Sequence, residues 1–132
     1  MNLVAVPIAA IPQEWPKIAA VLAPAIDRDP KRDAWEVMGE LFSGGMRLWR
    51  GADGASGYVV TQQVGTVFWV IYAAGAGHSL TGLRELMTAI EGMARAAGSM
   101  FVRFEGRDWR RVFPDYKARL KAGRWHFRKA LT

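Results

Sequence analysis

The spacing of apolar residues changes along the chain, and each change predicts a different element of secondary structure. Residues 3–8 are rich in Val and Ile, which predicts a first strand. Apolar residues then recur every three or four positions over residues 15–26 and 33–42, which predicts two helices. Pro16 suits a first helical turn, Pro24 predicts an early end or a kink, and a Ser-Gly-Gly sequence ends the second helix.

The middle of the chain alternates apolar and polar residues, which is typical of strands. Residues 46–50, 57–62 and 66–74 predict three strands, joined by glycine-containing turns into an antiparallel meander. The third strand is apolar almost throughout, which predicts a central strand covered on both faces. A helix over residues 80–97 and a strand over residues 100–104 then complete a β-α-β unit.

The C-terminal segment predicts a short helix and final strands. Residues 108–113 can form one or two helical turns before Pro114, and residues 116–121 and 124–128 alternate apolar and basic side chains. The order predicts an α/β fold of the mixed α+β class, with a mixed central sheet, an antiparallel N-terminal meander, one β-α-β crossover and helices on both faces. With 132 residues, no linker and no repeat, we expect a single domain over residues 1–132.

Composition narrows the classes of protein. The chain has no cysteine, which excludes disulfides and thiolate metal sites, and its two histidines lie far apart, so no metal site is predicted. No stretch approaches the roughly 20 apolar residues of a membrane-spanning helix, and the N-terminus lacks the basic start of a signal peptide. We therefore expect a soluble, cytoplasmic protein without a membrane partner.

The positive charge is concentrated near the C-terminus. Residues 99–132 carry ten Lys or Arg and three Asp or Glu, a local net charge of +7, whereas residues 1–98 carry eight basic and nine acidic side chains, a net −1. Such a basic block attracts the phosphates of a nucleotide cofactor, a nucleic acid or a membrane surface. The alternative is a solvated edge that only aids solubility.

One segment, Val70-Ile71-Tyr72-Ala73-Ala74-Gly75-Ala76-Gly77-His78-Ser79-Leu80, joins the apolar strand to the long helix. Glycines let a backbone approach a phosphate closely, and the free amides at a helix start supply donors and partial positive charge. Together with the order of elements, this segment resembles the GNAT superfamily of acetyltransferases over essentially the whole chain. Members of that family carry a Gln/Arg-x-x-Gly-x-Gly/Ala loop here; Gly75 and Gly77 match it, and Tyr72 departs from it.

The resemblance implies that this loop holds the pyrophosphate of acetyl-CoA or another acyl-CoA. The implied cofactor-binding residues are Tyr72, Ala73, Ala74, Gly75, Ala76, Gly77, His78 and Ser79. The alternative is that the glycines only make a tight turn between strand and helix. A P-loop would need Gly-Lys-Ser/Thr, and a dinucleotide fingerprint would need a third glycine, and neither follows here.

Acyl transfer to an amine needs a deprotonated amine and a proton donor for the departing thiolate. Many GNAT enzymes use a Tyr after the fifth strand as that donor, and the resemblance implies this role for Tyr116. The alternative is a Tyr packed at the start of a strand. The base is harder to find, because residues 66–74 contain no Asp, Glu or His. Glu105 is a candidate carboxylate, but Arg103 and Arg107 beside it predict an ion pair. His78 lies near a helix start that disfavours its protonated form, which suits a neutral base or a phosphate contact, and the alternative is a surface His in a loop.

The segment Gly106-Arg107-Asp108-Trp109-Arg110-Arg111 offers arginines for phosphate contacts, and we expect Trp109 to anchor the core. Its Gly-Arg-x-Trp stretch also resembles small GNAT-like proteins of bacteriophages and prophages, some of which act as virion or assembly components.

Three functions therefore stay open. The first is an acyl-CoA-dependent N-acyltransferase with an unknown acceptor. The second is a phage or prophage component without catalysis, incorporated in a phage particle with phage structural proteins as partners. The third is a nucleic-acid-binding module in which Trp125 and Phe127 interleave with Arg124 and Arg128, although an apolar core face explains that alternation equally.

Overall fold

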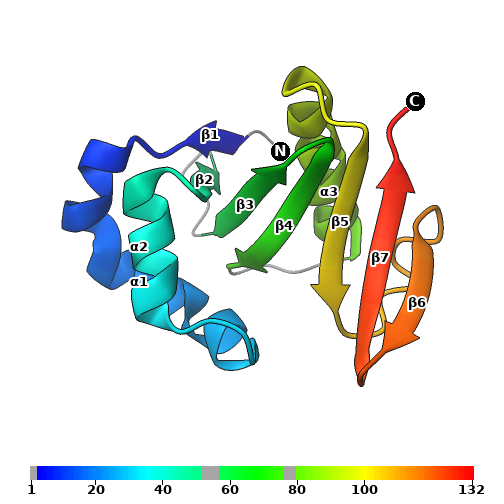
Figure 1. Ribbon diagram of the computed structural model, residues 1–132, viewed down its shortest axis with the longest axis horizontal. Helices are drawn as coiled ribbons and strands as arrows, with labels where there is room; N and C mark the ends of the chain where they lie inside the picture. Colours follow the sequence, from blue (N-terminus) through cyan, green and yellow to red (C-terminus); the bar gives the residue numbers. More distant parts are fainter. Residues whose placement is uncertain (1–2, 52–56, 76–79) are drawn as a thin grey trace. The chain divides into compact units, whose positions relative to one another are not determined.

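The computed structural model describes residues 3–51, 57–75 and 80–132, and Figure 1 shows its elements. In chain order they are β1 (Leu3–Ala5), a 3₁₀ turn η1 (Ile8–Ala10), α1 (Ile11–Asp27), α2 (Ala34–Ser43), β2 (Arg47–Gly51), β3 (Tyr58–Val64), β4 (Val67–Ala74), α3 (Leu80–Ala96), β5 (Phe101–Gly106), β6 (Lys117–Lys121) and β7 (Arg124–Ala130).

The seven strands of the described residues form one mixed sheet in the order β1-β2-β3-β4-β5-β7-β6. β2 is antiparallel to β1 and β3, and β7 is antiparallel to β5 and β6. β4 and β5 are parallel and are connected through α3, so the predicted β-α-β unit and the mixed α+β fold class are confirmed.

The described residues gather into two compact units. The N-terminal unit contains residues 3–51, 57–62 and 72–75, and the C-terminal unit contains residues 63–71 and 80–132. β3 and β4 contribute residues to both units. The single domain over residues 1–132 stays a prediction.

In the N-terminal unit, α1 is longer than its apolar spacing predicts. It begins at Ile11, so Pro12 rather than Pro16 occupies the first turn, where a missing N–H costs nothing. Pro24 does not end the helix, which continues to Asp27. The helix continues past Pro24 because one side of it carries a stripe of buried apolar side chains. The packing of this stripe offsets the roughly 3 kcal/mol that a proline in a helix interior costs. The stripe consists of Ile11, Ile18, Leu22 and Ile26.

Capping residues fix the ends of α2. The Asp33 side chain accepts a hydrogen bond from the Glu36 backbone N–H at 2.9 Å, and Gly44 ends the helix with a φ of 82°. An αL position of this kind favours glycine, which has no Cβ. The predicted Ser-Gly-Gly end of this helix is therefore confirmed.

Burial of the central strands differs from the prediction. β4 alternates: Phe68, Val70 and Tyr72 are buried, while Trp69 and Ile71 are half-buried. The first four residues of β3, by contrast, are all buried. The prediction that the strand at residues 66–74 is covered on both faces is therefore wrong. An apolar sequence does not distinguish a fully buried aromatic from one such as Trp69, part of whose ring stays accessible.

In the C-terminal unit, α3 packs against one face of β5, with Ile90 and Ala94 fully buried (Figure 1). On the same face Phe104 stacks on Phe127 with ring centroids 4.7 Å apart. The predicted helix over residues 108–113 is one turn only, in which the N–H groups of Val112 and Phe113 both donate to the Trp109 carbonyl. Pro114 lacks the N–H that would continue it.

Candidate functional site

The predicted cofactor-binding segment begins in β4, whose last three residues are Tyr72, Ala73 and Ala74. Tyr72 is buried, Ala73 is exposed, and Ala74 and Gly75 are half-buried. The other four predicted residues lie outside the described residues: Ala76, Gly77, His78 and Ser79. α3 begins at Leu80, so the strand–loop–helix order around the predicted loop is confirmed.

Gly57 allows a close backbone approach at this end of β4. A Cβ built on Gly57 would lie 3.2 Å from the Ala74 carbonyl oxygen and 3.7 Å from the Gly75 Cα. Because both neighbours are backbone atoms, a side chain there would push the end of β4 away. The sequence alone does not indicate this role for Gly57, because it is one of fourteen glycines in the chain.

The buried Tyr72 side chain ties β4 to the connection between α1 and α2. Its hydroxyl donates to Asp29 Oδ2 at 2.6 Å. Asp29 also accepts from the Lys31 backbone N–H at 2.8 Å and lies 3.4 Å from the Arg32 guanidinium. Burial opposes ionisation of Asp29, but the hydrogen bonds from Tyr72 and Lys31 and the charge of Arg32 outweigh it and lower its pKa. Burial, with the hydrogen bond and charge of Asp29, raises the pKa of Tyr72.

A carboxylate that sequence reasoning missed lies in the same unit. Glu14, on α1, places Oε1 3.3 Å from the Arg50 guanidinium, while its Oε2 is shielded from solvent and has no hydrogen-bond partner among the described residues. Arg50 pairs with Tyr58 in the β2–β3 ladder, and Tyr58 adjoins Gly57. Burial, then the charge of Glu14, raises the pKa of Tyr58. Glu14 therefore lies among residues that neighbour Gly57, and a contact 36 residues apart leaves no signal in the sequence.

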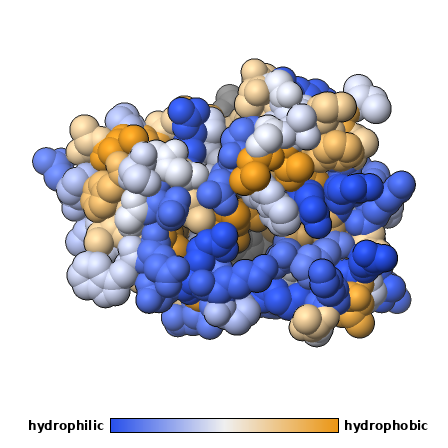
Figure 2. Space-filling view, viewed as in Figure 1, coloured by the Kyte–Doolittle hydropathy of each residue, from blue (hydrophilic) through white to orange (hydrophobic). Residues whose placement is uncertain are grey.

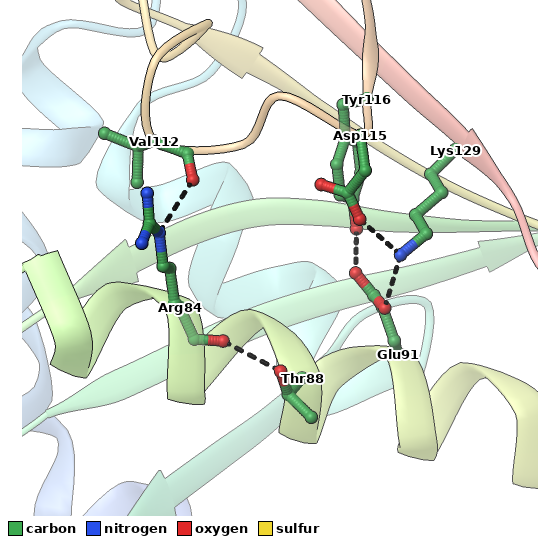
Figure 3. A network of polar contacts seen from close by, with 7 residues as sticks. All are labelled: Arg84, Thr88, Glu91, Val112, Asp115, Tyr116 and Lys129. Atoms are coloured by element: carbon green, nitrogen blue, oxygen red, sulfur yellow. Dashed lines mark hydrogen bonds and ion pairs between the residues drawn. The ribbon is translucent and has the colours of Figure 1, made fainter.

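Tyr116 takes part in a polar network within the C-terminal unit (Figure 3). It is 6 % exposed, and its hydroxyl donates to Oε2 of the buried Glu91 on α3 at 2.7 Å. Lys129 donates to Glu91 Oε1 at 3.0 Å and to Asp115 at 2.6 Å. Burial, with the hydrogen bond and charge of Glu91, raises the pKa of Tyr116 well above its usual range. The hydroxyl is thus held as a donor to a buried carboxylate.

The arginine-rich segment after β5 is held by its own neighbours. The Arg110 guanidinium lies 4.0 Å from the centre of the Trp125 ring and forms two 2.8 Å hydrogen bonds with Asp108. These bonds hold the pKa of Asp108 at about 2. Trp109 is half-buried, with its ring centre 6.5 Å from that of Phe113, which agrees with an anchoring role.

The sequence predicts an ion pair between Glu105 and its neighbours Arg103 and Arg107, whereas the structure places Glu105 beside two side chains of β7. It lies 3.6 Å from Arg124 and 3.2 Å from His126. Within the described residues no group of three or more His, Cys, Asp or Glu side chains could hold a metal ion. The part of the chain that is described also contains no helix with the length and apolar character of a membrane span.

Comparison with known proteins defines the class of fold. No family model matches the sequence, and no curated protein matches it. Solved structures do match: aminoglycoside 6'-acetyltransferase type Ii has a TM-score of 0.74 at 12 % identity, covering 100 % of this chain and 98 % of that one. An acetyltransferase of the GNAT family from Listeria monocytogenes has a TM-score of 0.65 at 10 % identity, covering 98 % and 94 %.

A third solved structure extends the comparison to acyl groups. A Klebsiella pneumoniae protein assigned as an acyl-CoA N-acyltransferase has a TM-score of 0.64 at 15 % identity, covering 99 % of this chain and 97 % of that one. The chain therefore has the GNAT fold over its full length, as its sequence predicts. The resemblance to phage-encoded proteins stays a prediction.

Proposed function

We propose that this protein is an acyl-CoA-dependent N-acyltransferase that acts on an amine. The observation that carries the proposal is the GNAT fold along the whole chain, with a double-glycine loop between the end of β4 and the start of α3. A helix start offers unpaired N–H groups and partial positive charge, which suit the pyrophosphate of an acyl-CoA. The backbone from Tyr72 to Gly75 and the loop up to Ser79 would then hold the acyl donor.

Gly57 supports this placement from the neighbouring strand. Because Gly57 has no side chain, the backbone just before β3 can approach the Ala74 carbonyl and Gly75 closely. This close approach fixes the backbone that leads into the loop. The Tyr72–Asp29 hydrogen bond fixes the same end of β4 from the opposite element, the α1–α2 connection. Both contacts pre-position backbone groups, which reduces the entropy lost when the donor binds.

Glu14 is our candidate for the general base. Its unpartnered Oε2 can accept the proton of an ammonium substrate, directly or through one water, and Arg50 holds the other oxygen. The neutral amine then attacks the thioester carbonyl, the N–C bond forms, the C–S bond breaks, and the coenzyme A thiolate leaves and takes up a proton. Asp29 is the poorer base, because three donors already stabilise its anion and lower its pKa.

Tyr116 has two alternative roles: it donates the proton that the coenzyme A thiolate takes up, or it is a structural residue. As a proton donor it would have to release the hydrogen bond to Glu91 in each catalytic cycle. As a structural residue it keeps that bond throughout. The buried contact at 2.7 Å favours the structural role, and the family resemblance favours the catalytic one.

Calorimetric titration with acetyl-CoA and with free coenzyme A tests the donor site. We expect micromolar binding that Gly77→Glu abolishes, because a carboxylate in the loop repels the pyrophosphate and fills the space left by the glycine. Gly92→Glu is the matched control: it adds the same charge on the exposed side of α3, where a Cβ meets no atom within 4 Å. No binding by a well-folded wild type would contradict the proposal.

A thiol-release assay with a panel of amines, aminoglycosides and polyamines included, tests the base. We expect Glu14→Gln to lower kcat by about 10²-fold or more, as for other general bases, while acetyl-CoA binding is unchanged. The control is Glu36→Gln, which removes the same charge from an exposed residue of α2. Equal kcat values for the two variants would remove Glu14 from the mechanism and leave the donor site standing.

A further inference from the structure

We infer that the open face of the C-terminal sheet binds single-stranded nucleic acid. This inference is independent of the acyltransfer proposal, because none of its residues belongs to the loop after β4 or to Glu14. The alternation of β5, β6 and β7 gives the sheet a packed face and a second face, which we call the basic face. Its residues are Phe101, Arg103 and Glu105 on β5, Arg124, His126 and Arg128 on β7, and Lys117, Arg119 and Lys121 on β6.

The strand register places cations directly opposite one another on this face. Arg103 pairs with Arg128, which pairs in turn with Lys117, so three positive side chains form a row across three strands. Lys121 pairs with Arg124 in a second row. Like charges directly opposite one another destabilise a sheet. A bound polyanion removes that repulsion, which is the first reason to assign this face an anionic ligand.

Aromatic rings lie among these cations. The Arg103 guanidinium sits 4.6 Å from the centre of the Trp69 ring, and the Arg128 guanidinium sits 5.3 Å from that of Phe101. Trp69 pairs with Arg103 in the β4–β5 ladder, so it shares the basic face, and both rings are half-buried. Guanidinium planes ordered on aromatic rings are surfaces on which nucleobases stack.

The exposure of the side chains on the basic face and its net positive charge also favour an anionic ligand. Lys117, Arg119, Lys121 and Arg128 are exposed. Glu105 is the one acidic residue on the face, against six Lys and Arg, and it lies between Arg124 and His126. Figure 2 shows hydrophilic side chains over much of the region of β5, β7 and β6.

The structure also corrects the aromatic residues of the sequence-based hypothesis. Phe127 is 1 % exposed and stacks on Phe104 on the packed face, so it is closed to bases. Trp125 lies on that same face, next to the Arg110 guanidinium. The alternation near residue 125 therefore places Trp125 and Phe127 on the packed face, and the aromatic residues of the basic face are Trp69 and Phe101.

A single strand fits this face better than the other polyanions. Flat rings with neighbouring cations suit unpaired bases and their phosphates, whereas a duplex hides its base faces. An anionic lipid surface would need protruding apolar side chains beside the cations that can insert between headgroups, whereas Trp69 and Phe101 are half-buried beside the Arg103 and Arg128 guanidiniums. On β6 the apolar Leu120 points to the other face, opposite Trp125, and not to the basic one.

The test is fluorescence anisotropy of a labelled oligothymidine of about 16 nucleotides, the upper end of common site sizes, titrated from low to physiological ionic strength. We expect binding that weakens linearly in a double-logarithmic plot against salt. Substituting Lys117, Arg119 and Lys121 by Gln should lower the slope by about 2, because each phosphate contact on a single strand contributes about 0.7. β6 is an exposed edge strand, so this variant should keep its fold.

The matched control is the triple variant Lys17→Gln/Arg47→Gln/Arg95→Gln, which removes three exposed cations outside the basic face. Its salt-dependence slope should differ from that of the wild type by no more than about 0.7, the contribution of one phosphate contact. Arg103→Lys keeps the charge but loses the planar group over Trp69, and should weaken binding without changing the slope. No binding at low salt, equal losses in the two triple variants, or tighter binding to a duplex or to phosphatidylserine vesicles would overturn the inference.

Discussion

The hydrogen bond between Tyr116 and Glu91 provides a direct test of how the C-terminal unit is held together. Tyr116→Phe keeps the ring, which packs 5.3 Å from that of Phe104, and removes only the hydroxyl. A hydrogen bond to a charged group contributes about 1.5–3 kcal/mol to the free energy of unfolding. The loss should not exceed this range, because Lys129 still pairs with the buried Glu91 carboxylate.

This free energy converts into a measurable melting shift. With about 2.1 cal/mol/K of unfolding entropy per residue over 132 residues, the variant should melt roughly 5–11 °C below the wild type. The assay is urea unfolding followed by fluorescence of the six tryptophans, with equal m-values confirming an unchanged unfolding reaction. The control is Tyr58→Phe, since the buried Tyr58 forms no hydroxyl hydrogen bond with the described residues.

Three outcomes separate the structural role of Tyr116 from the catalytic one. A variant within about 0.5 kcal/mol of the wild type would refute the structural argument, since surface changes alone give differences of that size. Normal stability together with a strongly reduced kcat would establish Tyr116 as the proton donor. A loss of stability with a retained kcat, measured well below the melting temperature, is the result that the buried contact predicts.

Three further changes have definite expected outcomes. Ala122→Asn should raise the free energy of unfolding by about 0.5–1 kcal/mol in urea titrations, because Ala122 holds a φ of 52° in the β6–β7 turn. Asp33→Ala should lower it by about 1 kcal/mol, since the cap on the Glu36 N–H is lost. The free energy of unfolding of the wild type should fall below about pH 3.8, because Asp29 has a lowered pKa in the folded protein and is protonated first in the unfolded chain. It should also fall above about pH 10, because Tyr72 has a raised pKa in the folded protein and ionises first in the unfolded chain. In melts recorded across this pH range, Tyr72→Phe should reduce the loss of stability at both ends.

The elements that could be predicted are those specified by local patterns. The spacing of apolar residues along α3, the β-branched strands and the Ser-Gly-Gly end of α2 each depend on neighbours in the sequence. The extent of α1 could not be predicted in this way. Its prolines indicate breaks, and only the buried contacts of Ile18, Leu22 and Ile26 show that packing overrides them.

The order of strand, loop and helix around the candidate site could be predicted, but its contacts could not. Tyr72 meets Asp29 across 43 residues, and Glu14 meets Arg50 across 36. Such pairs are set by how the elements pack, and no spacing rule encodes them. The strand that carries the loop contains no Asp, Glu or His, and Glu14, whose Oε2 has no hydrogen-bond partner among the described residues, comes from the first helix.

A basic edge that served only solubility would not need the register seen in the C-terminal sheet. Solubility depends on net charge and tolerates any placement, and mixing the signs of charge avoids cross-strand repulsion. Here Arg103, Arg128 and Lys117 face one another across three strands, and the acidic side chains of Asp115 and Glu91 lie with Lys129 on the packed side. Added salt should therefore stabilise the free protein, by screening these rows, while it weakens oligonucleotide binding, by competing for the same cations. A solvated edge with the same rows predicts the stabilisation by salt but no oligonucleotide binding, so the binding that depends on Lys117 is what separates the two explanations.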